Sequence, residues 1–214
     1  MTDRCKQDTF LVQIGNRRDE HHRAVSTPIY FSTAFRHEHI GLQDGYDYTR
    51  SANPTRDVLE EAVAELEGGD GAFATSSGMA AVQLVFSLFE KGAHFIASRD
   101  IYGGNFRLFE VYEEKYGFRF SYWDGKSYEE LAELIEEDTQ AIFIETPTNP
   151  LMQTTDLEKV SEITKAHNIL HIVDNTLFTP YVQKPLEIGA DIVIHSATKY
   201  LAGHNDVLAG LVIS

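Results

Sequence analysis

Lys199 stands in the segment HSATKYLAGH, residues 195–204, directly after the apolar run DIVIHS. Such a run is typical of a buried β-strand, and an amine at its end is unusual because lysine is rarely buried. Hydroxyl side chains flank it at Ser196 and Thr198. A lysine held in its neutral form attacks carbonyl carbons, so the segment indicates Schiff-base chemistry.

Other reactive or polar side chains follow other apolar runs. Asp174 ends ILHIVD, where a carboxylate needs a cation or hydrogen bonds to stay ionised. Tyr102 follows HFIAS and precedes a glycine pair, so its ring could be exposed and stack on a planar ligand. Asn149 follows AIFIE in a loop with two prolines. A capping carboxylate, a tyrosine packed under a loop and a plain turn residue are the structural alternatives.

The segment SSGMAAVQLVFSLF follows the run GAFAT and predicts a helix that begins with small residues. The free N–H groups and the dipole at a helix N-terminus favour a phosphate group. Neither GxxxxGK[ST] nor GxGxxG is present, so a simple serine N-cap is the alternative for this motif taken alone.

In open α/β sheets the carboxyl ends of the strands share one edge, where ligands bind. Together the side chains at this edge are complementary to a phosphorylated aromatic aldehyde with a basic ring nitrogen, which is pyridoxal 5′-phosphate (PLP). Lys199 would form the Schiff base, Asp174 would pair with the pyridinium nitrogen, and Tyr102 would stack on the ring. The other cofactor-binding residues at this edge would be Ser77, Gly78, Met79, Asn149, Ser196 and Thr198.

The pattern of the chain predicts the elements that hold these residues. Seven apolar runs alternate with amphipathic segments of helix length, and the segment from Pro54 to Gly68-Gly69 carries start and stop signals of a helix. Runs without polar alternation favour parallel strands covered by helices, so residues 57–214 are predicted to form an α/β domain. Residues 1–56 have no clear period and are expected to lie across another surface.

The composition sets outer limits on function. The chain has 214 residues, 43% of them hydrophobic, and a formal net charge of −15. This charge argues against nucleic acid and against anionic membranes as partners. A single cysteine, Cys5, excludes a disulfide within the chain, and no leader or membrane-spanning run is seen. A cytoplasmic protein is therefore expected.

The motifs SSGMAA, DIYGG, ETPTNP, VDNT and SATKYLAGHND, in this order and spacing, resemble the Cys/Met-metabolism family of PLP-dependent enzymes. The resemblance extends from about residue 14 to the last residue. It implies the aspartate-aminotransferase-like fold, known as fold type I. GNRRDE, STAFRHEHIG, GYDYTRSANPTRD and YGGNFRLFE are most similar to the bacillus-type cystathionine γ-synthase/O-acetylhomoserine thiolyase group.

The resemblance also gives the N-terminal segment a role. In YDYTRSANPT, Tyr48 and Arg50 match family residues that bind the PLP phosphate of the neighbouring subunit. The arm 1–56 is thus expected to reach a partner in a homodimer, and dimers to pair into a homotetramer. Family members continue into a C-terminal substrate domain, so this chain is expected to be a fragment of a longer protein.

The implied reaction is γ-replacement, in which cysteine or another thiol is joined to an O-acylated homoserine, and O-acetyl is the favoured acyl group. Lys199 would carry protons between the substrate and cofactor carbons, and Tyr102 would assist. A cystathionine β- or γ-lyase is the main alternative. Methionine γ-lyase activity is disfavoured because Gly104 stands where such enzymes carry cysteine. Asn105 replaces a threonine more usual in the family, with no assigned effect.

Other classes of protein fit the sequence less well. An inactive scaffold or remnant of the fold would be expected to have lost Lys199 or Asp174. A serine hydrolase lacks GxSxG, and a nicotinamide-dependent dehydrogenase lacks its glycine fingerprint. The histidines, including His37 and His39, lack the spacing of a known zinc site, and no metal is expected.

Overall fold

The computed structural model describes residues 7–37, 39, 41 and 45–214, so Cys5 lies outside the described residues. Within this part of the chain, the strands form one seven-stranded sheet in the order β1-β7-β6-β5-β4-β2-β3. Their bounds are β1 Ala72–Thr75, β2 His94–Ser98, β3 Arg119–Trp123, β4 Thr139–Glu145, β5 Leu170–Asp174, β6 Ile192–His195 and β7 Gly210–Ile213.

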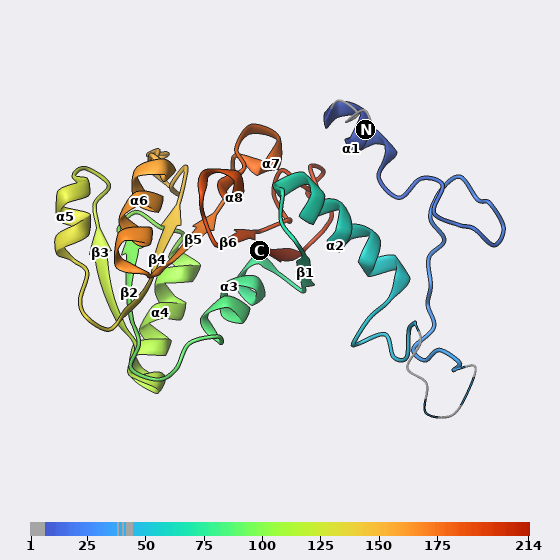
Figure 1. Ribbon diagram of the computed structural model, residues 1–214, viewed down its shortest axis with the longest axis horizontal. Coiled ribbons are helices and arrows are strands. Elements are labelled where there is room, and N and C mark those ends of the chain that lie inside the picture. The colour runs from blue at the N-terminus through green and yellow to red at the C-terminus, as the bar shows by residue number, and fades with distance from the viewer. Residues whose placement is uncertain (1–6, 38, 40, 42–44) are drawn as a thin grey trace.

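Helices cover both faces of this sheet (Figure 1). Their bounds are α1 Gln7–Gln13, α2 Pro54–Glu67, α3 Gly78–Phe86, α4 Gly103–Tyr116, α5 Tyr128–Glu133, α6 Leu157–His167, α7 Thr179–Val182 and α8 Pro185–Ile188. One face packs against α3 and α4 in an apolar cluster that contains Phe86, Phe109 and Phe143. The opposite face packs against α5 and α6 on one side and against α2 on the other. The predicted α/β architecture is confirmed.

The helix predicted from Pro54 is confirmed as α2. Asn53 caps it by accepting a hydrogen bond from the Thr55 N–H, and Gly68 ends it in the left-handed conformation. Ahead of α2, the described residues between 14 and 53 are mostly irregular, and in Figure 1 they lie beyond α2, outside the sheet. The N-terminal stretch does contain α1, a helix of 7 residues that the sequence pattern did not predict.

The sheet is mainly parallel, as predicted, with an antiparallel exception at one side. β7 runs antiparallel to both β6 and β1, whereas the other pairs are parallel. β1 and β3 are edge strands, and the Phe73 side chain in β1 is 60% exposed. Because two antiparallel steps restore the direction, β1 still points the same way as β6, and its carboxyl end joins the same edge.

No helix within the described residues is long and apolar enough to cross a membrane.

Phe86 is the centre of the aromatic cluster beneath the functional edge. Its ring is fully buried, and its centroid lies 5.0 Å from those of Phe95 and Phe109. We predict that Phe86→Ala lowers the free energy of unfolding by about 3–5 kcal/mol, because it removes this packing and leaves a cavity. Urea unfolding of the wild type and of Phe86→Ala measures this difference in the free energy of unfolding. Phe106→Ala, at a partly exposed ring of α4, is the matched control; an equal loss in both variants would contradict this role of Phe86.

Candidate active site

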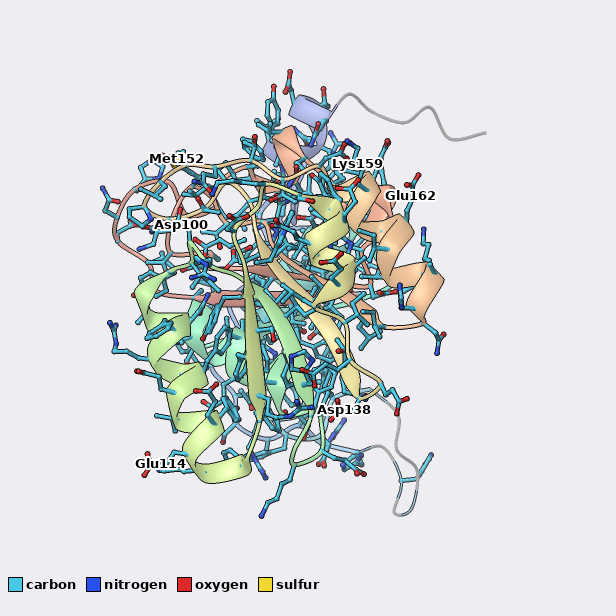
Figure 2. The ribbon with its side chains drawn as sticks, turned by 90° about the vertical axis from the view of Figure 1, so that its left-hand side faces the viewer. Asp100, Glu114, Asp138, Met152, Lys159 and Glu162 are labelled. Atoms are coloured by element: carbon cyan, nitrogen blue, oxygen red, sulfur yellow. The ribbon has the colours of Figure 1, made fainter. Side chains whose placement is uncertain are left out.

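A cavity of about 190 Å³ opens at the carboxyl edge of the sheet. Figure 2 shows this edge at the top, where Asp100 and Met152 follow β2 and β4, while Asp138, which precedes β4, lies at the opposite edge. The cavity brings together nine of the predicted residues: Ser77, Gly78, Met79, Tyr102, Asn149, Asp174, Ser196, Thr198 and Lys199.

Asp174 is the last residue of β5, and its Oδ1 accepts two hydrogen bonds from Thr176. One comes from the Thr176 backbone N–H at 3.0 Å and the other from its hydroxyl at 2.5 Å. The same hydroxyl oxygen accepts the Ser196 N–H at 2.8 Å. Thr176 therefore links the carboxylate to the loop that carries Lys199.

Glu145 is a second carboxyl residue in the cavity, at the end of β4. It lies beside Asp174 in the register of the two parallel strands. Its Oε2 accepts the Tyr102 N–H at 2.9 Å, and its Oε1 accepts the Asn149 N–H at 2.8 Å. One buried side chain thus holds the two loops that present the predicted stacking ring and the predicted loop amide.

The two carboxyl groups share a water-poor environment. Burial raises the pKa of Asp174, against the hydrogen bonds from Thr176 and the nearby His195, which lower it. Burial and then the charge of Asp174 raise the pKa of Glu145 to about 8, although the two backbone N–H bonds act in the opposite direction. We conclude that Asp174 ionises first and that Glu145 retains its proton near neutral pH.

The predicted phosphate seat has the local geometry that an anion requires. Ser77 caps α3 by accepting the Ala80 N–H at 3.1 Å, so the amides of Gly78 and Met79, in the first turn, stay available at the cavity. A Cβ on Gly78 would lie 2.6 Å from the Ser196 Cβ, which leaves room only for glycine there. This close approach joins the helix start and the Ser196 hydroxyl into one cradle, and the donor set fits a phosphate group.

Thr198 and Lys199 have different surroundings. The Thr198 hydroxyl exchanges hydrogen bonds with the Ala209 backbone, donating to its carbonyl and accepting its N–H, both at 3.2 Å. Lys199 lines the cavity and is exposed to solvent. The loop after β6 carries the residue beyond the strand end, where it is open to solvent.

The ring of Tyr102 folds back over Gly104 and is partly exposed. A Cβ on Gly104 would collide with this ring and lie 3.0 Å from the Met79 Sδ. Any larger residue at position 104 must therefore move the ring that is predicted to stack on the cofactor.

Tyr48 and Arg50 are the two predicted residues that the structure does not bring to the cavity. They lie in the N-terminal segment, where the Arg50 guanidinium stands 5.5 Å from the centroid of the Tyr48 ring. Tyr48 forms an isolated bridge with Ala34, and both side chains are exposed. Neither residue lines the cavity of its own chain.

The histidines that could be considered as metal ligands have other partners. His195 Nε2, at the end of β6, lies 2.5 Å from Glu67 Oε1, at the end of α2, in a fully buried pair. His37 Nε2 lies 3.1 Å from Asp47 Oδ1 in the N-terminal segment. The described residues offer one cluster with metal-ligand spacing, at the far edge of the sheet, and its His94 ring already bonds two hydroxyl groups through both nitrogens.

Sequence reasoning missed Glu145 and Thr176. Glu145 carried a usable signal, since a carboxylate at the end of the apolar run AIFIE poses the same question as Asp174 at the end of ILHIVD. Thr176 had a weaker signal, a hydroxyl two residues after an aspartate, which is common in turns.

The comparisons with known proteins agree with this geometry. The family model for the Cys/Met metabolism PLP-dependent enzymes matches residues 8–214. The chain belongs to this family, and its cofactor is PLP. Its sheet and helices are those of the PLP-dependent enzymes of fold type I.

Relatives with different activities are similarly close. The chain is 56% identical to the cystathionine gamma-synthase/O-acetylhomoserine (thiol)-lyase of Bacillus subtilis, over 96% of this chain and 55% of the relative. It is 47% identical to the cystathionine gamma-lyase of the same organism, over 98% of this chain and 55% of that one. The crystal structure of cystathionine gamma synthase from Xanthomonas oryzae pv. oryzae with cystathionine gives a TM-score of 0.96 at 43% identity, over 99% and 55% of the two chains. The chain therefore spans about half the length of these relatives.

The raised pKa of Glu145 gives a prediction for the cofactor-free protein. Between pH 4.5 and about 8, folded Glu145 holds a proton that the unfolded chain has released, so the free energy of unfolding falls as the pH rises. Glu145→Gln should be less stable at pH 5 by about 1–3 kcal/mol, because its NH₂ group cannot accept a backbone N–H. Its loss of stability between pH 5 and 8 should be smaller than that of the wild type. Urea unfolding of the wild type and the variant between pH 5 and 8 tests both expectations. The same pH dependence of the free energy of unfolding in both proteins would contradict the raised pKa of Glu145.

Proposed function

We propose that the protein carrying this chain is a PLP-dependent cystathionine γ-synthase, which joins an O-acylated homoserine, O-acetylhomoserine in the first instance, to cysteine by γ-replacement. The observation that supports it most is the 56% identity to a relative named as cystathionine gamma-synthase and O-acetylhomoserine thiol-lyase. The cavity supports the chemistry, since Lys199, Asp174 and Tyr102 meet there at the ends of three separate strands.

The residues of the cavity have distinct proposed roles. Lys199 would hold the cofactor covalently at its aldehyde carbon, and the Asp174 carboxylate would pair with the protonated ring nitrogen. PLP, when bound, supplies an electron sink that stabilises negative charge on the carbon atoms of an amino-acid substrate. The Tyr102 ring would stack on the cofactor ring, and Asn149 would contact it from the loop after β4.

The phosphate would be held at the start of α3. Its proposed ligands are Ser77, Gly78, Met79, Ser196 and Thr198. To donate to a phosphate, the Thr198 hydroxyl must give up its hydrogen bond to the Ala209 carbonyl. The backbone amides of the helix start need no such rearrangement.

Lys199 is also the proposed proton carrier of the reaction. The neutral amine of Lys199 would remove and return protons at the substrate carbon atoms, while the cofactor would supply the electron sink. Its exposure and its position on a loop give the side chain the reach for this transfer. Tyr102, whose ring lies in the same cavity, would assist.

We further propose that residues 1–56 act as an arm that completes the site of a neighbouring subunit, with residues 57–214 as the PLP-binding domain. The positions of Tyr48 and Arg50 support this proposal, because both are exposed and lie outside their own chain's cavity. A planar guanidinium is suited to a phosphate. The active unit would be a homodimer, with dimers paired into a homotetramer, and we place it in the cytoplasm.

A carbon–sulfur lyase acting on cystathionine is the second candidate. The 47% identity to proteins named cystathionine gamma-lyase and cystathionine beta-lyase favours it. A methionine γ-lyase is less favoured, since a cysteine at position 104 would collide with the Tyr102 ring in its present position. In every case the substrate carboxylate would be bound by a C-terminal domain outside this chain.

The cofactor and the reaction are separable by experiment. We predict that the purified protein shows a visible absorbance band of lysine-bound PLP, that borohydride bleaches it, and that Lys199→Ala lacks it. Product analysis should then show cystathionine formed from O-acetylhomoserine and cysteine, faster than cystathionine is cleaved. A bleachable band with cleavage only would favour the lyase. The absence of a band after PLP is added would refute the enzyme assignment.

Shared active sites predict complementation between two inactive variants. Arg50→Ala and Lys199→Ala should each be nearly inactive. Subunits of the two, unfolded together and refolded, should recover roughly a quarter of wild-type activity, since half of the dimers are hybrids with one intact site. If Arg50 serves its own chain, the mixture stays inactive. The two variants refolded separately and then combined are the control.

A further inference from the structure

Asn105 has an unusual environment for a polar residue. It lies in the first turn of α4 with its side chain only 1% exposed. Its backbone N–H donates to the Tyr102 carbonyl at 2.8 Å, but among the described residues neither Nδ2 nor Oδ1 of the carboxamide has a hydrogen-bond partner. A buried polar group without a partner destabilises a fold, so this position would favour an apolar residue unless the amide has a partner in the working protein.

The cavity shows where that partner lies. Asn105 lines it together with Glu145 and Asp174. Side chains alternate along a strand, and Phe143 and Ile172, two residues before these carboxyl residues, belong to the apolar cluster under α3 and α4. Both carboxyl groups therefore face the same helices. Asn105 stands on the matching face of α4, one turn before the fully buried Phe109.

The register of helix and strand places the amide in the same layer as the carboxyl groups. Phe109 packs against Phe143, with ring centroids 5.9 Å apart. α4 runs antiparallel to β4, because it connects the parallel strands β2 and β3. The four residues from Phe109 back to Asn105 rise about 6 Å, and the two residues from Phe143 to Glu145 advance about 6.6 Å in the same direction. Asn105 thus stands over the end of β4.

We propose that Asn105 is a positioning residue that bridges the two carboxyl groups of the active site. Its Oδ1 accepts the proton of neutral Glu145, and its Nδ2 donates to ionised Asp174, directly or through one water molecule. A carboxamide has one acceptor group and one donor group, so it can pair with one neutral and one charged carboxyl group. A carboxylate lacks the donor, and an apolar side chain lacks both. The bridge fixes the negative charge on Asp174, where the proposed function requires it for the cofactor ring nitrogen.

The other charged groups near Glu145 and Asp174 are consistent with a neutral Glu145 and an ionised Asp174. Asp100, after β2, adds negative charge that favours protonation of Glu145. His195, the last residue of β6, favours ionisation of Asp174. Lys199 also lines the cavity, and α3 contributes Gly78, Met79 and Val82 to the lining, none of which is ionisable.

Three substitutions at Asn105 test the bridge through PLP binding, measured by absorbance titration of the cofactor-free protein. Asn105→Leu keeps the volume and removes both polar groups, and Asn105→Asp keeps the shape but removes the donor. Each should weaken PLP binding by roughly 10- to 100-fold, the effect of losing a hydrogen bond to a charged group. Asn105→Thr, whose hydroxyl both donates and accepts, should remain within about threefold of wild type.

A structural role would give a different pattern. The cofactor-free Leu variant should still be folded at the temperature of the titration, and its loss of PLP affinity should exceed its loss of stability. Its loss of PLP affinity should also shrink when Glu145→Gln is already present, since the two residues act through one bridge. Wild-type affinity in the Leu variant, or equal losses of stability and affinity in all three variants, would overturn the proposal. If the wild type itself binds no PLP, the proposed function fails instead.

Discussion

The register of β4 and β5 places two buried carboxyl groups side by side, and the rest of the site depends on this constraint. Two negative charges side by side in a water-poor cavity repel each other strongly. One of the two carboxyl groups therefore keeps its proton. Neutral Glu145 then serves as an acceptor for two loop amides, and Asp174 is left to carry the charge. A carboxyl group that holds two loops and one that is proposed to pair with the cofactor thus occupy neighbouring positions in one sheet. Their different hydrogen-bond partners separate the two roles.

Much of this edge could be predicted from the sequence because parallel strands bring the residues after their carboxyl ends to one side of the sheet. Nine residues chosen for their place after an apolar run do line one cavity. The role of Glu145 was missed because a carboxylate at a strand end was considered only once, at Asp174. The environment of Asn105 was beyond sequence reasoning, because its burial results from the packing of α4 over β4, and its spacing resembles that of an ordinary helix start.

The direction of β7 shows a second limit. A run of four buried residues has the same composition whether it pairs parallel or antiparallel, and hydrophobic pattern alone does not distinguish the two. The connection differs: residues 196–209 contain no helix, whereas the parallel neighbours in this sheet are joined by connections that contain helices. β7 therefore turns back beside β6, and the segment that carries Lys199 stays at the functional edge.

Two backbone contacts hold that segment in place. Gly210, at the start of β7, lies so close to the Ser77 carbonyl that a Cβ would collide with it, which ties the end of the loop to the start of α3. The Thr198 hydroxyl ties its beginning to Ala209. The backbone of Lys199 is fixed in turn, since its N–H donates to the Ser196 carbonyl at 3.1 Å and its own carbonyl accepts the Gly203 N–H at 2.9 Å. The amine is thus exposed on a fixed backbone, and its selectivity must come from the groups that the cavity places within its reach.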